Sequence, residues 1–209
     1  MAGSLLKDRE LLQRFEFDRE YRKKYGVICG IDEAGRGPLA GAVYAAAVIL
    51  PEDIFIDGLN DSKKLSEKKR EALFDEITEN AVSYCIATAS AAEIDELNIL
   101  QAAMLAMKRA FDGLAEKPDY AIVDGNKVPQ LGIPAESVVK GDFVSASIAA
   151  ASILAKVSRD RYMKELDTKY PEYEFAKHKG YGTALHYEKL RQFGFCPEHR
   201  RSFFKKHPI

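Results

Sequence analysis

The sequence predicts an α/β protein whose mixed β-sheet is flanked by helices. Three observations favour this fold class. Short apolar runs of strand length recur along the chain, stretches with helical spacing of apolar residues separate several of them, and glycine or acidic residues stand where the runs end. The predicted order is strand, strand, helix, strand, helix, strand, strand and helix, an alternation that is typical of a mixed sheet.

Residues 1–25 predict one amphipathic helix, because their apolar side chains follow helical spacing. Its apolar positions are Leu5, Leu6, Leu12 and Phe15. Residues 26–32 and 41–50 come next and predict two buried strands, since both runs are short, apolar and bounded by glycine. The segment 57–66 has the composition of a loop. The short connection between the first two strands holds the first candidate site.

The middle of the chain predicts two helices around a third strand. Ser66 can cap the first of these helices. Its apolar face consists of Leu73, Phe74, Ile77 and Ala81. Residues 84–90 predict the strand, Ser90 with Glu93 has the spacing of a capping box, and Asn98 with Gln101 repeats that spacing. The second helix has apolar residues, with methionine as core filler, at Leu97, Leu100, Met104, Met107, Phe111 and Leu114.

The last part of the chain predicts two strands and two helices. Residues 120–126 and 136–142 are the strand-like runs. Residues 145–166 are rich in alanine and serine and predict a helix whose small side chains let it pack very close to the sheet. Thr183 can begin a final helix over residues 184–193.

The composition is that of one globular protein, and we expect residues 1–209 to form a single domain. Hydrophobic residues make up 46% and charged residues 30% of the chain, which is ordinary for a soluble protein. No apolar run approaches the roughly 18–20 residues of a membrane span, and the N-terminal segment lacks the apolar core of a signal peptide. The three widely spaced cysteines predict free thiols in a reducing compartment, so we expect a cytoplasmic protein.

The C-terminal segment, residues 175–209, is strongly basic although the net charge of the chain is only −1. It contains eight lysine or arginine residues against two acidic ones, and all four histidines of the chain lie in it. Two interpretations stay open for this segment. It is either a solvated end of the chain or a surface that contacts an anion.

Carboxylates follow three of the strand-like runs: Asp32 with Glu33, then Asp124, then Asp142. One acid at one strand end is usually a turn residue, and that interpretation would suffice for Asp124 alone. Four acids at three strand ends are harder to explain as turns, because sites in open α/β sheets form at strand ends. The four acids therefore form one candidate site.

A site made of four carboxylates predicts divalent cations. Unpaired carboxylates that are brought together repel one another, and two cations remove this repulsion. Hard oxygen ligands suit Mg²⁺ or Mn²⁺ rather than zinc, and no histidine or cysteine cluster competes for the site in the sequence. Two such ions about 3.5–4 Å apart stabilise the attacking and the leaving oxygen of a phosphoryl displacement. The acids therefore favour phosphodiester hydrolysis.

Asp32 and Glu33 are adjacent, and adjacent side chains on a regular strand point to opposite faces. We expect the strand to bend or end between them, so that both can serve one site. The triplet Gly35, Arg36 and Gly37 just afterwards has two interpretations. It is a tight turn, or it is a loop where Arg36 holds a phosphate and the closely approaching backbone binds a sugar hydroxyl. The 2′-hydroxyl is the group that separates RNA from DNA.

Six segments, taken in chain order, resemble the successive motifs of bacterial ribonuclease HII, a type 2 ribonuclease H. They are “GIDEAGRGPLAGAVYAAAVIL”, “LNDSKKLSEKKRE”, “VDGN”, “KGD”, “SIAAASILAKVSRD” and “HKGYGTALH”. The resemblance runs from about residue 26 to residue 204 and covers nearly the whole chain. The related ribonuclease HIII lacks the Gly-Arg-Gly triplet, so the chain is similar to ribonuclease HII.

The resemblance implies a ribonuclease-H-like fold, with a mixed sheet flanked by helices and a helical C-terminal extension. It implies metal-dependent hydrolysis of RNA in RNA–DNA hybrids and at single ribonucleotides embedded in DNA. The implied products carry 3′-hydroxyl and 5′-phosphate ends, and the implied role is the removal of misincorporated ribonucleotides. The implied metal-binding catalytic residues are Asp32, Glu33, Asp124 and Asp142, with Mg²⁺ or Mn²⁺ as cofactor.

The resemblance also assigns the substrate-binding residues. Gly35, Arg36 and Gly37 would read the 2′-hydroxyl, and Tyr181 would stack against the sugar of the adjoining deoxynucleotide. Two glycines flank Tyr181 and leave its ring uncrowded, which suits stacking, although a buried tyrosine is more often part of a core. Lys63, in the loop over residues 57–66, either contacts phosphates or is simply exposed.

Two rival functions stay open at this point. One is another nuclease or a strand transferase of the same superfamily, which hybrid and all-DNA substrates would separate. The other is a nucleic-acid-binding module without activity, against which the complete set of four acids argues. We expect a monomer without membrane contact, and the sequence leaves open whether a sliding clamp or a polymerase recruits it.

Overall fold

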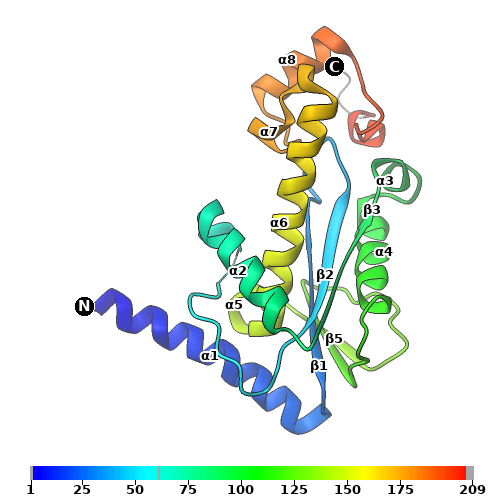
Figure 1. Cartoon of the computed structure of the whole chain (residues 1–209). Coiled ribbons are helices and arrows are strands. Elements are labelled where there is room, and N and C mark those ends of the chain that lie inside the picture. Colours follow the sequence, from blue (N-terminus) through cyan, green and yellow to red (C-terminus); the bar gives the residue numbers. More distant parts are fainter. Residues whose placement is uncertain (1, 61, 206–209) are drawn as a thin grey trace.

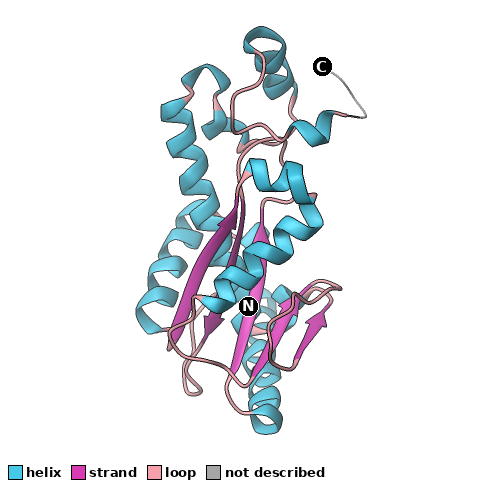
Figure 2. Cartoon of the chain, turned by 90° about the vertical axis from the view of Figure 1, so that its right-hand side faces the viewer, coloured by secondary structure: helices cyan, strands magenta, loops and turns pink. Residues whose placement is uncertain are grey.

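The computed structural model describes residues 2–60 and 62–205, which fold around an open five-stranded sheet (Figure 1). The strands are β1 (Ile28–Ala34), β2 (Val43–Ile49), β3 (Ser83–Ala89), β4 (Tyr120–Asp124) and β5 (Ala135–Val138). Their order across the sheet is β3-β2-β1-β4-β5, and Figure 2 shows them side by side with the helices around them. β1 is antiparallel to β2 and parallel to β4, so the predicted mixed sheet is confirmed.

Helices connect the strands and form the C-terminal extension. They are α1 (Ala2–Tyr25), α2 (Glu67–Asn80), α3 (Ala91–Leu97), α4 (Ile99–Asp112), α5 (Gly141–Val144), α6 (Ala146–Lys169), α7 (Phe175–His178) and α8 (Ala184–Phe193). The 3₁₀ turns are η1 (Ser62–Lys64), η2 (Pro171–Tyr173) and η3 (Arg201–Phe204). In Figure 1, α4 and α6 lie on opposite sides of the sheet, while α7 and α8 lie beyond its upper end.

The alternation of side chains along the central strands builds two apolar cores, one on each face of the sheet. Cys29 and Ile31 of β1 belong to the core with α4, whereas Ala46 and Val48 of β2 belong to the core with α6. Gly30 of β1 also faces α6, and a Cβ atom added there would lie 2.2 Å from the helix backbone. The close approach predicted for the alanine-rich helix is therefore confirmed.

Helix α1 covers the predicted residues but buries a different face from the one expected. Leu11 is buried in the core with α6, whereas Leu12 is 58% exposed and Phe15 is partly buried. The predicted position of Leu12 on the apolar face is therefore wrong. The side chains of Leu5 and Leu6 lie outside the described part of the chain.

Two polar residues explain why α1 buries this face. Arg14 and Asp18 are both almost completely buried. Asp18 accepts hydrogen bonds from the hydroxyl groups of Ser145 and Ser147, at 2.6 Å each, and from the backbone N–H of Ser147 at 2.8 Å. Ser145 is the N-cap of α6, so α1 holds the N-terminal end of that helix with a carboxylate.

The remaining helices follow their sequence signals with one exception. Ser66 caps α2, and the capping box of Ser90 and Glu93 begins α3, as predicted. Asn98 caps α4 as predicted, but it adopts a φ of +72° between α3 and α4 and so separates Leu97 from the helix to which that residue was assigned. Leu97 consequently lies at the surface rather than in the core.

The C-terminal extension has a small core of its own. Phe175 of α7 and Leu190 of α8 pack in it with Met163, from the C-terminal half of α6. The three cysteines of the chain, Cys29, Cys85 and Cys196, are free thiols, as predicted. None of the described helices is long and apolar enough to cross a membrane.

Candidate active site

Asp32 and Glu33 lie near the C-terminal end of β1, which stays in regular register with β2 through Ala34. The bend expected between the two acids is therefore wrong, because the antiparallel partner keeps β1 extended past both. Asp32 faces α6, where its carboxylate accepts a hydrogen bond from Ser152 and another, at 2.7 Å, from the N–H of Glu33. Glu33 lines a cleft that Ser152 also borders.

Asp124 ends β4, the parallel neighbour of β1. Ile31 lies beside Val123 across these two strands, so the residues that follow them, Asp32 and Asp124, point to the same face of the sheet. Oδ1 of Asp124 accepts a hydrogen bond of 2.6 Å from the N–H of Gly141. The register of the sheet thus brings the acids of two strands together, as the strand-end pattern predicts.

Asp142 is buried in the first turn of α5. β5 ends at Val138, Lys140 takes a left-handed conformation with a φ of +57°, and α5 begins directly after it. The prediction that a strand ends near Asp142 is therefore wrong in its bounds, because a turn and a helix carry this acid. The contact between Gly141 and Asp124 nevertheless ties the turn to β4, directly before Asp142.

Burial and mutual repulsion act on the acids of β1. Burial, followed by repulsion from Glu33 and Asp124, raises the pKa of Asp32 well above its usual value. Burial also raises the pKa of Glu33, and the Arg36 guanidinium, 3.2 Å from the Glu33 carboxylate, opposes this shift. Burial therefore disfavours the charged forms of both carboxylates, and Arg36 offsets this only in part for Glu33.

The donor chemistry of this site fits a divalent cation. The acids at the ends of β1 and β4 offer only carboxylate oxygens, the donors that Mg²⁺ and Mn²⁺ prefer. Within residues 2–60 and 62–205, no three acidic, histidine or cysteine side chains are drawn together closely enough to chelate an ion. The raised pKa values of Asp32 and Glu33 reflect burial first and repulsion between carboxylates second, and a bound cation would favour the charged forms of both.

The glycine triplet continues from β1 as a turn along the same cleft. Gly35 has a φ of +96°, and a Cβ atom there would lie 2.0 Å from Nε of Arg159, so only glycine fits. A Cβ atom on Gly37 would instead meet, within 4 Å among the described residues, only the ring of Tyr181, at 3.7 Å. The side chain of Arg36 is half exposed.

Tyr181 lies across the cleft from this turn. Its side chain is 46% exposed and lines the cleft, so the interpretation of Tyr181 as a core residue is wrong. The backbone around it is fixed, because its N–H donates to the carbonyl of His178 at 2.9 Å and its carbonyl accepts from Nδ1 of His186 at 3.0 Å. The partly exposed ring therefore stands on a well-anchored loop.

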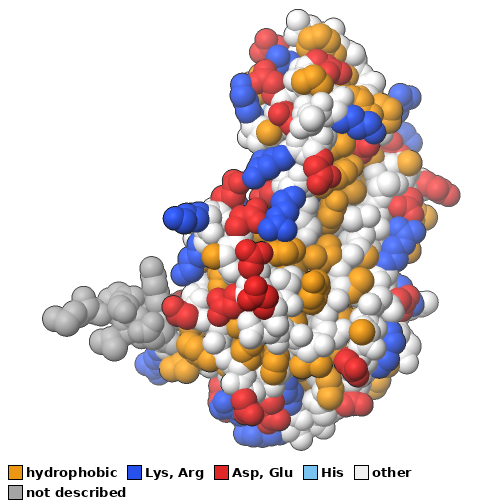
Figure 3. Space-filling view, in the orientation of Figure 1, with side chains coloured by type: hydrophobic (Ala, Val, Ile, Leu, Met, Phe, Trp, Pro, Cys, Tyr) orange, Lys and Arg blue, Asp and Glu red, His pale blue; other side chains and the backbone are white. Residues whose placement is uncertain are grey.

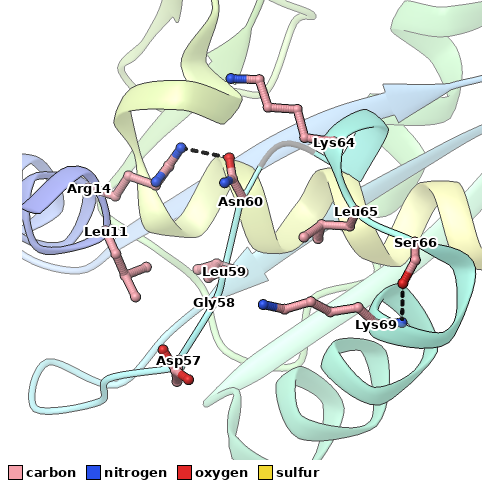
Figure 4. Close-up of a pocket in the computed structure, with 10 residues that line it drawn as sticks. All are labelled: Leu11, Arg14, Asp57, Gly58, Leu59, Asn60, Lys64, Leu65, Ser66 and Lys69. Carbon is pink, nitrogen blue, oxygen red and sulfur yellow. Dashed lines mark hydrogen bonds between the residues drawn. The ribbon is translucent and has the colours of Figure 1, made fainter. Parts of the chain in front are cut away.

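Lys63 lies in η1 and borders the cleft. The loop that carries it is held on both sides. Arg14 of α1 donates to the side chain of Asn60 at 2.9 Å, and Figure 4 shows this bond in the pocket between α1, the loop and the start of α2. The hydroxyl groups of Ser62 and Ser152 lie 2.9 Å apart and are buried. Helix α1 therefore supports the loop of Lys63 as well as the N-terminal end of α6.

The chain is similar in sequence to known proteins over most of its length. The sequence model of the family described as “Ribonuclease HII” matches residues 29–207. The chain belongs to the ribonuclease HII family. It is also 57% identical to the protein named “Ribonuclease HII” from Aliivibrio fischeri (strain MJ11), over 184 residues that make up 88% of this chain and 89% of that protein.

Solved structures share the fold of this ribonuclease HII. The ribonuclease H2 from Pyrococcus horikoshii OT3 has a TM-score of 0.71 at 29% identity, over 84% of this chain and 92% of that one. A structure of the PCNA:RNase HII complex from Archaeoglobus fulgidus has a TM-score of 0.70 at 27% identity, over 83% and 93%. Bst-RNase HIII in complex with Mn²⁺ shares the fold at 18% identity, with a TM-score of 0.64 over 80% and 63%. The ribonuclease-H-like fold class is confirmed.

The family assignment decides between the functions that the sequence left open. As a ribonuclease HII, the chain is a metal-dependent endoribonuclease that cleaves RNA in RNA–DNA hybrids. A strand transferase and a nucleic-acid-binding module without activity are both excluded.

Four residues around the ribonuclease HII cleft were missed by reasoning from single residues. Ser152, Lys156 and Arg159 line the cleft from α6. Their intervals of four and three are helical, so a helix placed over the acidic strand ends would have indicated them. Arg200, which holds the glycine turn from behind, has no such signal, because it lies far along the chain in the basic segment.

The basic C-terminal segment of this ribonuclease HII is less available to an anion than its composition indicates. Lys177 and Lys189 both pair with Glu174, and Arg200 is fully buried. The buried histidines of the segment are His178, His186 and His199. Figure 3 shows lysine and arginine side chains dispersed over one face of the molecule, with acidic side chains between them. Contact between this segment and the substrate stays a prediction.

Proposed function

We propose that Asp32, Glu33, Asp124 and Asp142 are the catalytic carboxylates and that they hold Mg²⁺ or Mn²⁺. We further propose that the cleft beside them accepts a single ribonucleotide embedded in duplex DNA as well as a continuous hybrid. Cleavage would leave 3′-hydroxyl and 5′-phosphate ends. The corresponding role is the removal of misincorporated ribonucleotides from DNA.

One observation carries this proposal: the glycine turn and the Tyr181 ring face each other across a cleft that Glu33 also lines. A ribose beside Gly37 would bring its 2′-hydroxyl within reach of the peptide groups of the turn. The ring would pack on the neighbouring deoxyribose, where a missing hydroxyl permits close contact. A junction between a ribonucleotide and DNA would satisfy both sides of the cleft at once.

The cations around the cleft would hold and orient the phosphates. Lys63 and Lys156 border the cleft, and Arg36 is half exposed beside Glu33. When bound, the divalent cations would stabilise negative charge on the attacking and leaving oxygens. The protein would contribute the position of the scissile phosphate through the turn, Tyr181 and these basic side chains.

The experiment that tests the proposal maps cleavage on three duplexes of the same sequence. One contains a single ribonucleotide, one is all DNA, and one is a continuous RNA–DNA hybrid. With saturating Mg²⁺ or Mn²⁺, we expect cuts in the hybrid and one cut at the single ribonucleotide, with a 5′-phosphate on the downstream product. Cleavage of the hybrid without any cut at the single ribonucleotide, or equal cleavage of the all-DNA duplex, would contradict the proposal.

We also propose that residues 1–209 act as one catalytic domain and as a monomer in the cytoplasm. The free cysteines support a reducing compartment. Light scattering on the eluting protein tests the oligomeric state, and a mass of twice the 23.3 kDa of one chain would contradict it.

A further inference from the structure

We propose that Arg200 is a positioning residue for ribonucleotide selection: it orients the peptide groups of the glycine turn toward the substrate sugar. Arg200 does not line the cleft and acts through the turn rather than by touching the substrate. The inference rests on the proposed function, in which this turn reads the 2′-hydroxyl.

The guanidinium group of Arg200 binds a series of carbonyl groups in the loop between β1 and β2. Nη2 donates to the carbonyl of Gly35 at 2.7 Å, and Nη1 donates to those of Arg36 and Pro38 at 3.0 and 2.7 Å. Nε donates to the carbonyl of Gly41 at 2.8 Å. Four acceptors around one side chain require the rigid, planar fork of arginine, since lysine carries all its donors on one nitrogen.

These bonds fix the direction of the N–H groups on the other side of the turn. In a trans peptide, the carbonyl and the N–H of the following residue point in opposite directions. The carbonyl groups of Gly35 and Arg36 point to Arg200, so the N–H groups of Arg36 and Gly37 point away from it. Neither N–H has a hydrogen-bond acceptor within the described ranges of the chain. Both donors are therefore available to a sugar hydroxyl in the cleft.

The buried charge of Arg200 resists any rearrangement of this loop. Arg159 lies nearby and donates to the carbonyl groups of Ala40, Ala42 and Lys179, at 3.1–3.2 Å. Burial, and then repulsion from Arg159, lower the pKa of Arg200 to about 9. If the loop turned its carbonyl groups away, a buried guanidinium would lose its acceptors, which is strongly unfavourable. The orientation of the turn is thus coupled to the burial of Arg200.

The backbone around Arg200 also sets the distance between the turn and Tyr181. The N–H of Arg200 donates to the carbonyl of Leu39 at 2.9 Å, and the N–H of Leu39 donates to the carbonyl of Gly180 at 2.8 Å. Gly180 directly precedes Tyr181. Leu39, in the loop between β1 and β2, is therefore bound both to Arg200 and to the residue before Tyr181. Arg200 fixes both the donors of the turn and the gap in which the sugar would lie.

The experiment compares Arg200→Lys and Arg200→Gln with Arg201→Gln as the matched control. Arg201 is the neighbouring arginine and is exposed, so its substitution removes one charge without touching the turn. Fluorescence anisotropy, without divalent cations, measures the affinity for a duplex with one ribonucleotide and for the same duplex in DNA alone. We expect Arg200→Lys to reduce the preference for the ribonucleotide roughly tenfold, a loss of about 1.4 kcal/mol, while its affinity for plain DNA stays unchanged. Arg201→Gln should keep the preference.

The possible outcomes separate this inference from the proposed function. A wild-type protein with no preference for the ribonucleotide would contradict both. A clear wild-type preference that Arg200→Lys retains in full would overturn the inference about Arg200 alone. Circular dichroism and thermal melting report whether each variant folds. If Arg200→Gln fails to fold, the binding preference of Arg200→Lys decides the question. Failure of both variants to fold would make Arg200 a determinant of folding and would also overturn the inference.

Discussion

At the scale of single residues, Asp124 is the acid whose loss should separate catalysis from folding. Its carboxylate accepts the N–H of Gly141, and an amide oxygen can accept the same bond. Asp124→Asn should therefore fold normally, yet lose on the order of 10³-fold or more in metal-dependent cleavage, because an amide is a much weaker metal ligand. The measurements are turnover of a hybrid at saturating Mg²⁺ and thermal melting.

Asp112→Asn provides the matched control for this prediction. Asp112 lies on the exposed side of α4, where it pairs with Lys108 at 2.5 Å. Its substitution makes the same chemical change away from the strand ends and should leave turnover unchanged. A folded Asp124→Asn protein with nearly wild-type turnover would remove Asp124 from the site.

Tyr181 should contribute more at a junction than within a continuous hybrid. Stacking on an aromatic ring contributes about 1–3 kcal/mol per base by alanine substitution, and we apply that scale to the sugar. Tyr181→Ala should lose about 10- to 100-fold in cleavage at a single embedded ribonucleotide, with a smaller loss on a continuous hybrid. Tyr181→Phe should be milder, because the ring remains. Cleavage kinetics of both variants on both substrates test this, and equal losses on the two substrates would reduce Tyr181 to a general contact.

At the scale of elements, the contact between α1 and the N-terminal end of α6 should stabilise the fold. Asp18→Ala leaves the Ser145 and Ser147 donors without their buried acceptor, so the free energy of unfolding should fall by about 2–3 kcal/mol. Glu20→Ala, on the exposed side of α1, should change it by less than about 0.5 kcal/mol. Urea denaturation measures both values. Equal stability of the two variants would show that the contact of Asp18 contributes nothing.

Three buried histidines lie between the loop of Tyr181 and the stretch over residues 196–199 that precedes η3. His186 donates from Nδ1 to the Tyr181 carbonyl at 3.0 Å, and its Nε2 lies 3.1 Å from Nε2 of His199. Nδ1 of His199 accepts the N–H of Cys196 at 3.0 Å, so both rings keep these roles only while they are neutral. Burial is the main cause that lowers the pKa of His186 and of His199 to about 4. His178 stacks on His186, with their ring centroids 4.3 Å apart.

These low pKa values make the stability of the fold depend on pH. Both rings bind a proton less readily in the folded chain than in the unfolded chain, where the pKa of histidine is about 6.5. Their contribution is therefore complete above about pH 6.5 and decreases as the pH falls toward 4. Thermal melting between pH 4.5 and 7.5 should show a lower melting temperature at acidic pH. His199→Gln should reduce this dependence on pH, and an unchanged slope in that variant would contradict the assignment.

At the scale of the whole molecule, the sequence predicts the features that have a local signal. The caps at Ser66 and Ser90, the apolar runs of the strands and the acids Asp32 and Asp124 can all be recognised within a few residues. The buried face of α1 could not be predicted, because it is set by the hydrogen bond of Asp18 with Ser145, which lies 127 positions further along the chain. The contacts of Arg200 leave no periodic pattern for the same reason. Long-range polar contacts are what single-sequence reasoning misses here.

The bond between Arg200 and Gly35 joins positions that are 165 residues apart, and this separation has a consequence for biosynthesis. Translation proceeds from the N-terminus, so β1 and the glycine turn leave the ribosome long before Arg200 has been added. The carboxylates on β1, β4 and α5 are all synthesised before it as well. On the roles proposed for these carboxylates and for Arg200, a chain that stops short of Arg200 contains the catalytic acids, the glycine turn and Tyr181, but not the side chain that orients the turn. The contacts that orient the turn are then completed only late in synthesis.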